Sequence, residues 1–177
     1  FMMTIGGQLQ TVDLILLHAQ IVLGNWTDVM HSLYLGAKRL GNIFMLIVGL
    51  PVLSMKLKFR DTSLLVSLTI SMIISFGWLG FSTTYWELYI SSLFSSVMPV
   101  IEAIIQSQLS KTVPEKHHGK IFATNTVVFD LANILSYVVG MSAFTATYHI
   151  SSGLVFFIFG GTTALALSLA LYLWKIA

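Results

Sequence analysis

Cysteine is absent from the 177 residues, and charged side chains are scarce. Without a thiol, the chain can form no disulfide, no cysteine-ligated zinc site and no iron–sulfur cluster. Charged residues make up 9% of the chain, against about 25% in an ordinary soluble domain. Hydrophobic residues make up 56%, and so little polar surface could not cover so much apolar surface in water. The composition therefore excludes a water-soluble enzyme or binding domain and indicates an integral membrane protein.

Enzyme signatures are also missing. The chain has no GxSxG nucleophile motif, no HExxH zinc motif, no GxGxxG dinucleotide loop and no GxxxxGK[ST] phosphate loop. No two histidines have the spacing of metal ligands on a helix, and the net charge of +2 is too small to indicate nucleic acid. We therefore expect no enzymatic activity, no metal or other cofactor, and no nucleic-acid partner.

Long apolar runs predict six membrane-spanning helices, because about 20 apolar residues cross a bilayer as a helix. None of the runs has the period-2 alternation of barrel strands. Pro51 and Pro99 predict a stop or a kink in the second and fourth spans, because proline lacks the backbone N–H that a helix needs. The expected fold class is all-α integral membrane, with spans at about residues 2–24, 33–55, 62–81, 86–109, 120–146 and 152–174.

Loop charges predict the orientation of these spans. Seven of the nine cations fall on one side, which the positive-inside rule makes cytoplasmic: Lys56, Lys58, Arg60, Lys111, Lys116, Lys120 and Lys175. Asn25 begins an N-x-T glycosylation sequon on the opposite side. We expect a multi-pass protein of the plasma membrane or an endolysosomal membrane, with both ends of the chain cytoplasmic.

Ionisable residues inside spans are hypotheses of function, because a charge at mid-bilayer costs roughly 2.5–3.5 kcal/mol. Asp13 shares a helix face with Gly6, Gln10 and Gln20, which predicts a water-filled or substrate-bearing cavity. Asp130 shares one with Thr126, Asn133 and Tyr137, and Glu102 precedes Gln106 by one turn. The alternative is a set of buried polar clusters that hold helices together.

Three basic or titratable side chains lie toward the outer ends of the spans. Lys38 and Arg39 either extend to the headgroups or attract an anionic substrate. His18 can carry a proton if it faces a cavity. Small residues four apart predict close helix packing in lipid, at Ala132, Ser136 and Gly140 and at Gly160, Ala164 and Ser168.

The loop at residues 109–122 (LSKTVPEKHHGKIF) is the most specific stretch of the chain. It resembles the L-S-K-x-V-P-x-x-E-x-G-K-x-F segment of the proton-coupled folate transporter family, within the major facilitator superfamily. Residues 58–64 (KFRDTSL) are similar to that family's charged loop and helix entry. Residues 13–17 (DLILL), followed by Trp26 and Asp28, are similar to its seventh helix and the outer loop after it.

The resemblance implies the C-terminal six-helix half of a twelve-helix major facilitator fold, with the N-terminal half missing from this chain. It also implies proton symport of organic anions or other small polar solutes. Gln8 stands near the position of the family's helix-seven histidine, and Gln106 or Glu102 near that of an arginine. His117 stands at the position of the family's loop glutamate.

The roles expected on this basis fall into three groups. Substrate or proton binding is assigned to Gln8, Gln10, Asp13, His18, Lys38 and Arg39; coupling or gating to Glu102, Gln106, Asp130 and Asn133; a cytoplasmic latch to Lys111, Glu115 and Lys120. The expected function is alternating-access transport of a polar or anionic solute, driven by a proton gradient. The rival hypothesis is a six-helix channel or receptor subunit that acts as a homo-oligomer.

Overall fold

The computed structural model describes residues 14–56 and 61–176, and these are helical apart from short turns, with no strand. The elements in chain order are α2 (Leu14–Leu23), α3 (Asp28–Phe44), the π-helical turns η2 (Met45–Gly49) and η3 (Val52–Lys56), α4 (Asp61–Phe81), α5 (Tyr85–Ser95), α6 (Met98–Thr112), the 3-10 turn η4 (Glu115–His117), α7 (His118–Thr147) and α8 (Leu154–Ile176).

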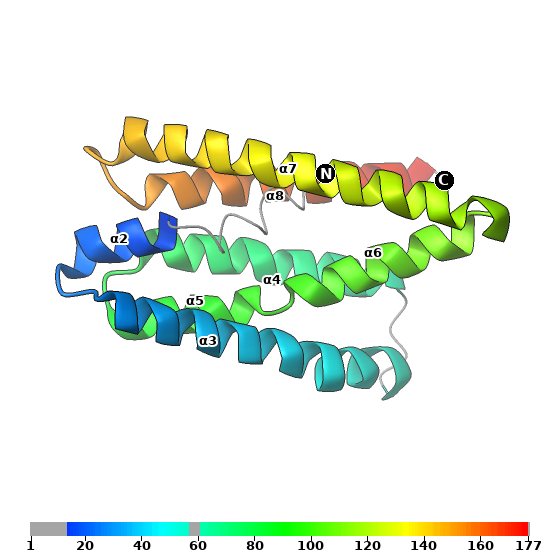
Figure 1. The fold of residues 1–177 in the computed structure, drawn as a ribbon, viewed down its shortest axis with the longest axis horizontal. Helices are drawn as coiled ribbons and strands as arrows, with labels where there is room; N and C mark the ends of the chain where they lie inside the picture. Colours follow the sequence, from blue (N-terminus) through cyan, green and yellow to red (C-terminus); the bar gives the residue numbers. More distant parts are fainter. Residues whose placement is uncertain (1–13, 57–60, 177) are drawn as a thin grey trace.

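Helices run along the long axis of the molecule and connect alternately at its two ends (Figure 1). The α2–α3, α4–α5 and α7–α8 connections lie at the left end of Figure 1, and the α6–α7 connection lies at the right end. Four helical stretches in the described ranges are long and apolar enough to cross a bilayer: Asp28–Ser54, Ser63–Phe81, Tyr85–Thr112 and Glu115–Thr147. They are compatible with a multi-pass membrane protein, as the composition predicts.

Helix α4 is the centre of the bundle, packed against α8 on one side and α5 on the other. Phe76 of α4 lies with Phe156 and Phe159 of α8 in the buried core. Toward α5 the contacts include hydrogen bonds: the Ser71 and Ser75 hydroxyls donate to backbone carbonyls of α5, at 3.0 and 2.8 Å. Side-chain bonds of this kind fasten helices to each other without a charge.

The predicted fourth span is divided into α5 and α6 by a turn at residues 96–97. Pro99 lies in the first turn of α6, where its missing N–H costs no helical hydrogen bond. Of the stop or kink predicted at Pro99, the structure shows a stop, because the helix is interrupted just before this proline. At Pro51 the helix does not stop. The chain stays helical through the proline, with the wider π-helical turns η2 and η3 on either side of it.

One of the two predicted small-residue stripes is confirmed as a packing face. Ala132, Ser136 and Gly140 are all buried on α7. The other stripe was predicted wrongly, since Gly160 is buried but Ala164 and Ser168 are exposed. Helix α8 instead buries a face with larger side chains, because phenylalanine rings make more contact with α4 than small side chains could. The buried residues of this face are Val155, Phe156, Phe159, Thr163 and Ala166.

The turn before α8 touches the end of α4 at two glycines. A Cβ added to Gly153 would collide with the backbone carbonyl of Gly80, whereas a Cβ on Gly161 would meet open space. Gly153→Ala is expected to lower the free energy of unfolding by about 1–3 kcal/mol, because backbone must move. Thermal melting in detergent measures the change, and Gly161→Ala is the matched control. Equal melting temperatures for the two variants would contradict the prediction.

Candidate functional site

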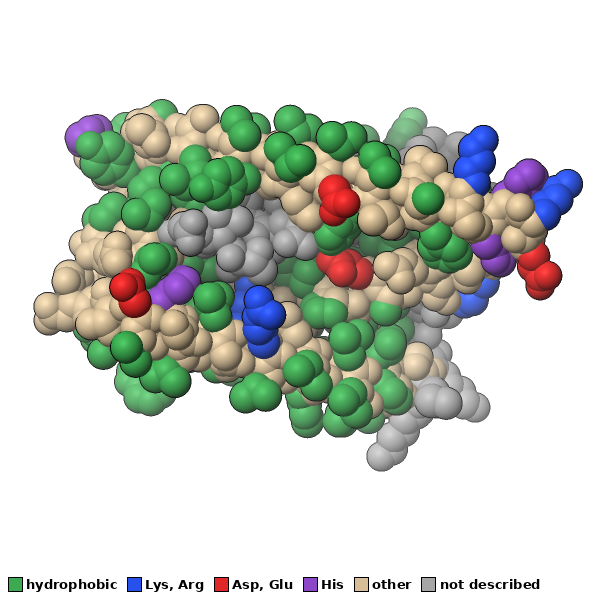
Figure 2. Space-filling model, in the orientation of Figure 1, with side chains coloured by type: hydrophobic (Ala, Val, Ile, Leu, Met, Phe, Trp, Pro, Cys, Tyr) green, Lys and Arg blue, Asp and Glu red, His purple; other side chains and the backbone are tan. Residues whose placement is uncertain are grey.

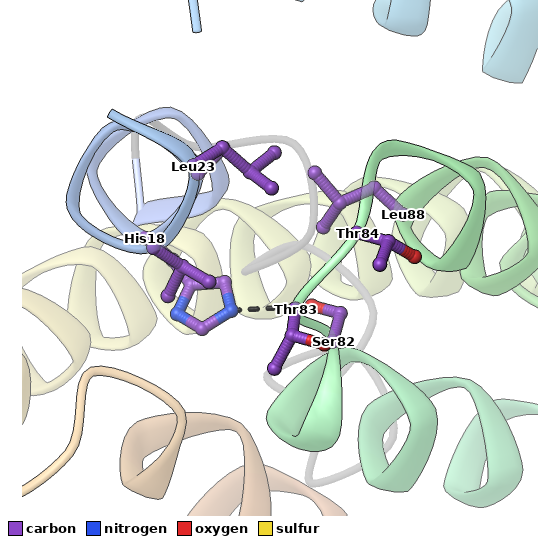
Figure 3. Close-up of a pocket in the computed structure, with 8 residues that line it drawn as sticks. His18, Leu23, Ser82, Thr83, Thr84 and Leu88 are labelled. Carbon is purple, nitrogen blue, oxygen red and sulfur yellow. Dashed lines mark hydrogen bonds between the residues drawn. The ribbon is translucent and has the colours of Figure 1, made fainter. Parts of the chain in front are cut away.

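His18 joins three parts of the bundle at the α2–α3 end. It lies on α2 and is only 2% exposed. Its Nε2 is 3.2 Å from the Ser82 hydroxyl oxygen, and its Nδ1 is 2.8 Å from that of Ser152. Ser82 follows α4 and Ser152 precedes α8. One imidazole therefore fastens α2 to the α4–α5 and α7–α8 turns, and Figure 3 shows it facing Ser82.

The hydrogen bonds of Ser82 define the tautomer of this ring. The Ser82 hydroxyl donates to the carbonyl of Leu79 at 2.7 Å, so its oxygen accepts from the Nε2–H of His18. Nδ1 is then the acceptor for the Ser152 hydroxyl. The edge of the imidazole also packs against the Phe156 ring, with 5.2 Å between centroids. Both nitrogens of the neutral ring are satisfied without any charged partner.

The space beside His18 is too narrow for solvent. It has an empty volume of about 130 Å³ and no part wide enough for a water molecule. The lining residues labelled in Figure 3 are His18, Leu23, Ser82, Thr83, Thr84 and Leu88. Within the part of the chain that the structure describes, the space beside His18 is therefore closed to water, and a proton-carrying role for His18 stays a prediction.

The two adjacent cations of α3 have opposite environments. Lys38 is buried, with 5% of its surface exposed, and it lies one turn after the buried Tyr34. Arg39 is exposed. Extension to the headgroups therefore suits Arg39 alone, whereas the Lys38 side chain lies inside the bundle.

The acidic residues of the spans lie at different depths in the bundle. Glu102 on α6 is half-buried, and Gln106 one turn further is exposed. Asp130 on α7 is exposed, while Asn133 is half-buried and its Oδ1 is a buried atom with no hydrogen-bond partner. The helix α7 thus carries an exposed carboxylate and an unsatisfied amide oxygen within one turn of each other.

The remaining predicted residues lie at the ends of the molecule or outside the description. Glu115 and Lys120 are exposed, as is Lys111, and all three belong to the α6–α7 end, where Figure 2 shows charged side chains and histidines together. Asn25 is exposed at the opposite end, in the α2–α3 connection. The sequence also assigns roles to residues that lie outside the described ranges, namely Gly6, Gln8, Gln10 and Asp13.

An aromatic cluster, not predicted from the sequence, closes the α2–α3 end. Trp26 stacks on Tyr85 at 5.8 Å between centroids and meets Tyr34 edge-on at 6.4 Å. Tyr34 in turn meets Tyr89 edge-on at 5.8 Å. The signal available in the sequence was an enrichment in Trp and Tyr where a chain leaves the bilayer, which is typical of membrane interfaces.

Comparisons with known proteins add no identification. No family model, curated protein or solved structure matches the chain. Within the described residues, no group of three or more His, Asp or Glu side chains could hold a metal ion. Function must therefore be argued from the polar residues of the bundle.

Proposed function

We propose that the chain is one half of a secondary transporter that moves a small polar or anionic solute by alternating access. The observation that carries the proposal is the placement of Lys38, Glu102 and Asp130 on three different membrane-depth helices. Each costs free energy in lipid, and such residues usually line a substrate or ion pathway. A helical bundle with no enzyme motif and ionisable groups inside its spans fits a transporter better than a catalyst.

The exposure of Asp130 supports a second half in the complete protein. An exposed carboxylate at mid-span cannot face hydrocarbon, so it requires water or a polar partner. The stretch Asp28–Ser54, which carries Lys38, is also scarcely buried by the rest of the chain. In the proposed transporter a second six-helix unit faces α3 and α7, and the solute site lies between the two halves.

The resemblance of residues 109–122 to the proton-coupled folate transporter family supplies the finer parts of the proposal. These are the major facilitator fold, six spans, a proton as the coupling ion, and cytoplasmic placement of the α6–α7 end. The two shorter apolar helices in the described ranges, Leu14–Leu23 and Leu154–Leu169, would then be the first and sixth spans. The host membrane is proposed to be the plasma membrane or an endolysosomal membrane.

Asp130→Asn tests proton coupling. The amide keeps the shape of the carboxylate but cannot bind a proton, so uptake by the variant is expected to lose its dependence on a proton gradient. The measurement is uptake of a panel of organic anions into cells that express the full-length protein, at two external pH values. Asp28→Asn, which makes the same change at an exposed carboxylate in the first turn of α3, is the matched control. An Asp130→Asn variant with undiminished gradient dependence would refute this role.

A six-helix homo-oligomer is the second candidate, because a further copy of the chain could also cover the poorly buried stretch Asp28–Ser54. Cross-linking between cysteines introduced singly at Val29 and Leu40 distinguishes the two, since both side chains are well exposed on α3. Homodimer cross-links at both positions favour the oligomer. Their absence, together with gradient-driven uptake, favours the transporter.

A further inference from the structure

An open groove lies between α6 and α7 near their connection. Its volume is about 310 Å³. One wall comes from α6 and the other from the first turns of α7, and the lining residues are Leu109, Lys120, Ile121, Thr124, Asn125 and Val128. The groove is separate from His18 and from the mid-span carboxylates, and of its lining residues Lys120 also belongs to the predicted cytoplasmic latch.

The polarity of the groove changes along its length. Lys120, Thr124 and Val128 follow one another at four-residue intervals on α7, so they form a single row. At a rise of 1.5 Å per residue, this row is about 12 Å long. It begins with a cation, continues through a hydroxyl and ends with an aliphatic side chain. Ile121 and Leu109 add apolar surface to the walls.

The groove also has a defined position relative to a bilayer. Helix α7 has 30 residues, so it extends about 45 Å and exceeds the roughly 30 Å hydrocarbon core. Lys120 is its third residue and therefore lies at headgroup depth, whereas Val128 lies within the hydrocarbon. The direction of the polarity gradient matches the direction from headgroup to acyl chain.

The charge around the mouth of the groove is positive. This connection carries three cations, Lys111, Lys116 and Lys120, and one carboxylate, Glu115. Within the groove, the Thr124 hydroxyl proton is already donated to the Lys120 carbonyl at 2.9 Å. The Asn125 amide is therefore the neutral donor for an ester carbonyl at this depth, and the Lys120 ammonium is the donor for a phosphate.

We propose that this groove binds an anionic phospholipid. The phosphate lies against the Lys120 ammonium, the glycerol esters lie beside Asn125, and an acyl chain follows Ile121, Val128 and Leu109. Basic pockets between membrane helices are suited to anionic headgroups, which are abundant in the cytoplasmic leaflet. The inference rests on the placement of the chain in a membrane and is independent of whether the protein transports a solute.

Lipid retention in native mass spectrometry tests the site. The full-length protein is reconstituted into nanodiscs of phosphatidylcholine, with or without phosphatidylglycerol. It is then released in the mass spectrometer, and the lipids that stay bound are counted. The wild type is expected to retain phosphatidylglycerol selectively. Lys120→Gln is expected to weaken that retention about five-fold, since one lysine near an anionic surface contributes on the order of 1 kcal/mol. Lys120→Arg keeps the charge and is expected to retain the lipid.

Two further variants separate a groove from general loop charge. Lys116→Gln makes the same charge change in the same connection but lies outside the lining, so retention is expected to persist. Thr124→Trp fills the groove, keeps every charge and is expected to abolish retention. Melting temperatures confirm that each variant is folded.

Four results would overturn the proposal. The first is equal loss in Lys116→Gln and Lys120→Gln, and the second is unchanged retention in Thr124→Trp. The third is equal retention of phosphatidylcholine. The fourth is displacement of the lipid by soluble glycerol phosphate, which would make free phosphate the ligand. In the second case, loss of an oligomer in Thr124→Trp would show that the groove holds another protein chain and not a lipid.

Discussion

Lys38→Met is expected to reduce solute uptake about 10- to 100-fold, whereas Arg39→Met leaves uptake nearly unchanged. The reason is burial: Lys38 lies inside the bundle, and Arg39 is exposed. A hydrogen bond from a buried charge is worth about 1.5–3 kcal/mol, which corresponds to this range of affinity. Methionine preserves most of the length of the lysine side chain, so the change is chiefly one of charge.

Uptake and surface expression are measured together for these two variants, so that loss of protein is not mistaken for loss of transport. If both variants reduce uptake equally, the effect comes from the positive potential of α3 as a whole. If neither does, Lys38 is a structural cation, and the solute site must be sought elsewhere.

His18→Ala is expected to have the largest effect on stability, lowering the free energy of unfolding by about 2–4 kcal/mol. The substitution removes two buried hydrogen bonds and leaves a cavity against Phe156. It also separates α2 from both turns that the imidazole now holds. Thermal melting in detergent measures the loss of stability of the whole bundle. The rate of proteolytic cleavage just after residue 24, next to the end of α2, measures the local loosening of α2.

His117→Ala is the control for the His18 prediction, since His117 is exposed in the α6–α7 connection. Its effect should stay within about 0.5 kcal/mol. Double replacement of Ser82 and Ser152 by alanine should reproduce much of the His18→Ala loss, because it removes both partners of the ring. If the variant with alanine at both positions is as stable as the wild type, the two hydrogen bonds contribute little to the free energy of unfolding.

The sequence predicts the course of the helices well because apolar run length is a strong local signal. It places α4, α7 and α8 close to their observed bounds, and it predicts the interruption at Pro99 from the chemistry of one residue. It also predicts the packing face of Ala132, Ser136 and Gly140. Each of these inferences uses residues within a few turns of one another.

The sequence does not predict contacts between distant segments. Ser82 and Ser152 are separated from His18 by 64 and 134 residues, and serines are too common for their positions to indicate a partner. Lys38 and Arg39 point about 100° apart, because they are adjacent on a helix. Which of the two is buried is then determined by the position of the neighbouring helices. The small-residue stripe on α8 was predicted wrongly for the same reason, since the face of α8 that packs on α4 is the one that carries Phe156 and Phe159.

The division of the predicted fourth span has a mechanical consequence. Helix α5 is tied to α4 by the Ser71 and Ser75 hydroxyls, whereas α6, beyond the turn, carries Glu102. At the turn, the Ser92 carbonyl accepts from the Ser95 and Ser96 hydroxyls, so the interruption brings its own hydrogen-bond partners. The hydrogen bonds to α4 therefore hold α5, whereas α6, which carries Glu102, is held in the core through its own buried residues Val100, Ile101 and Ile104.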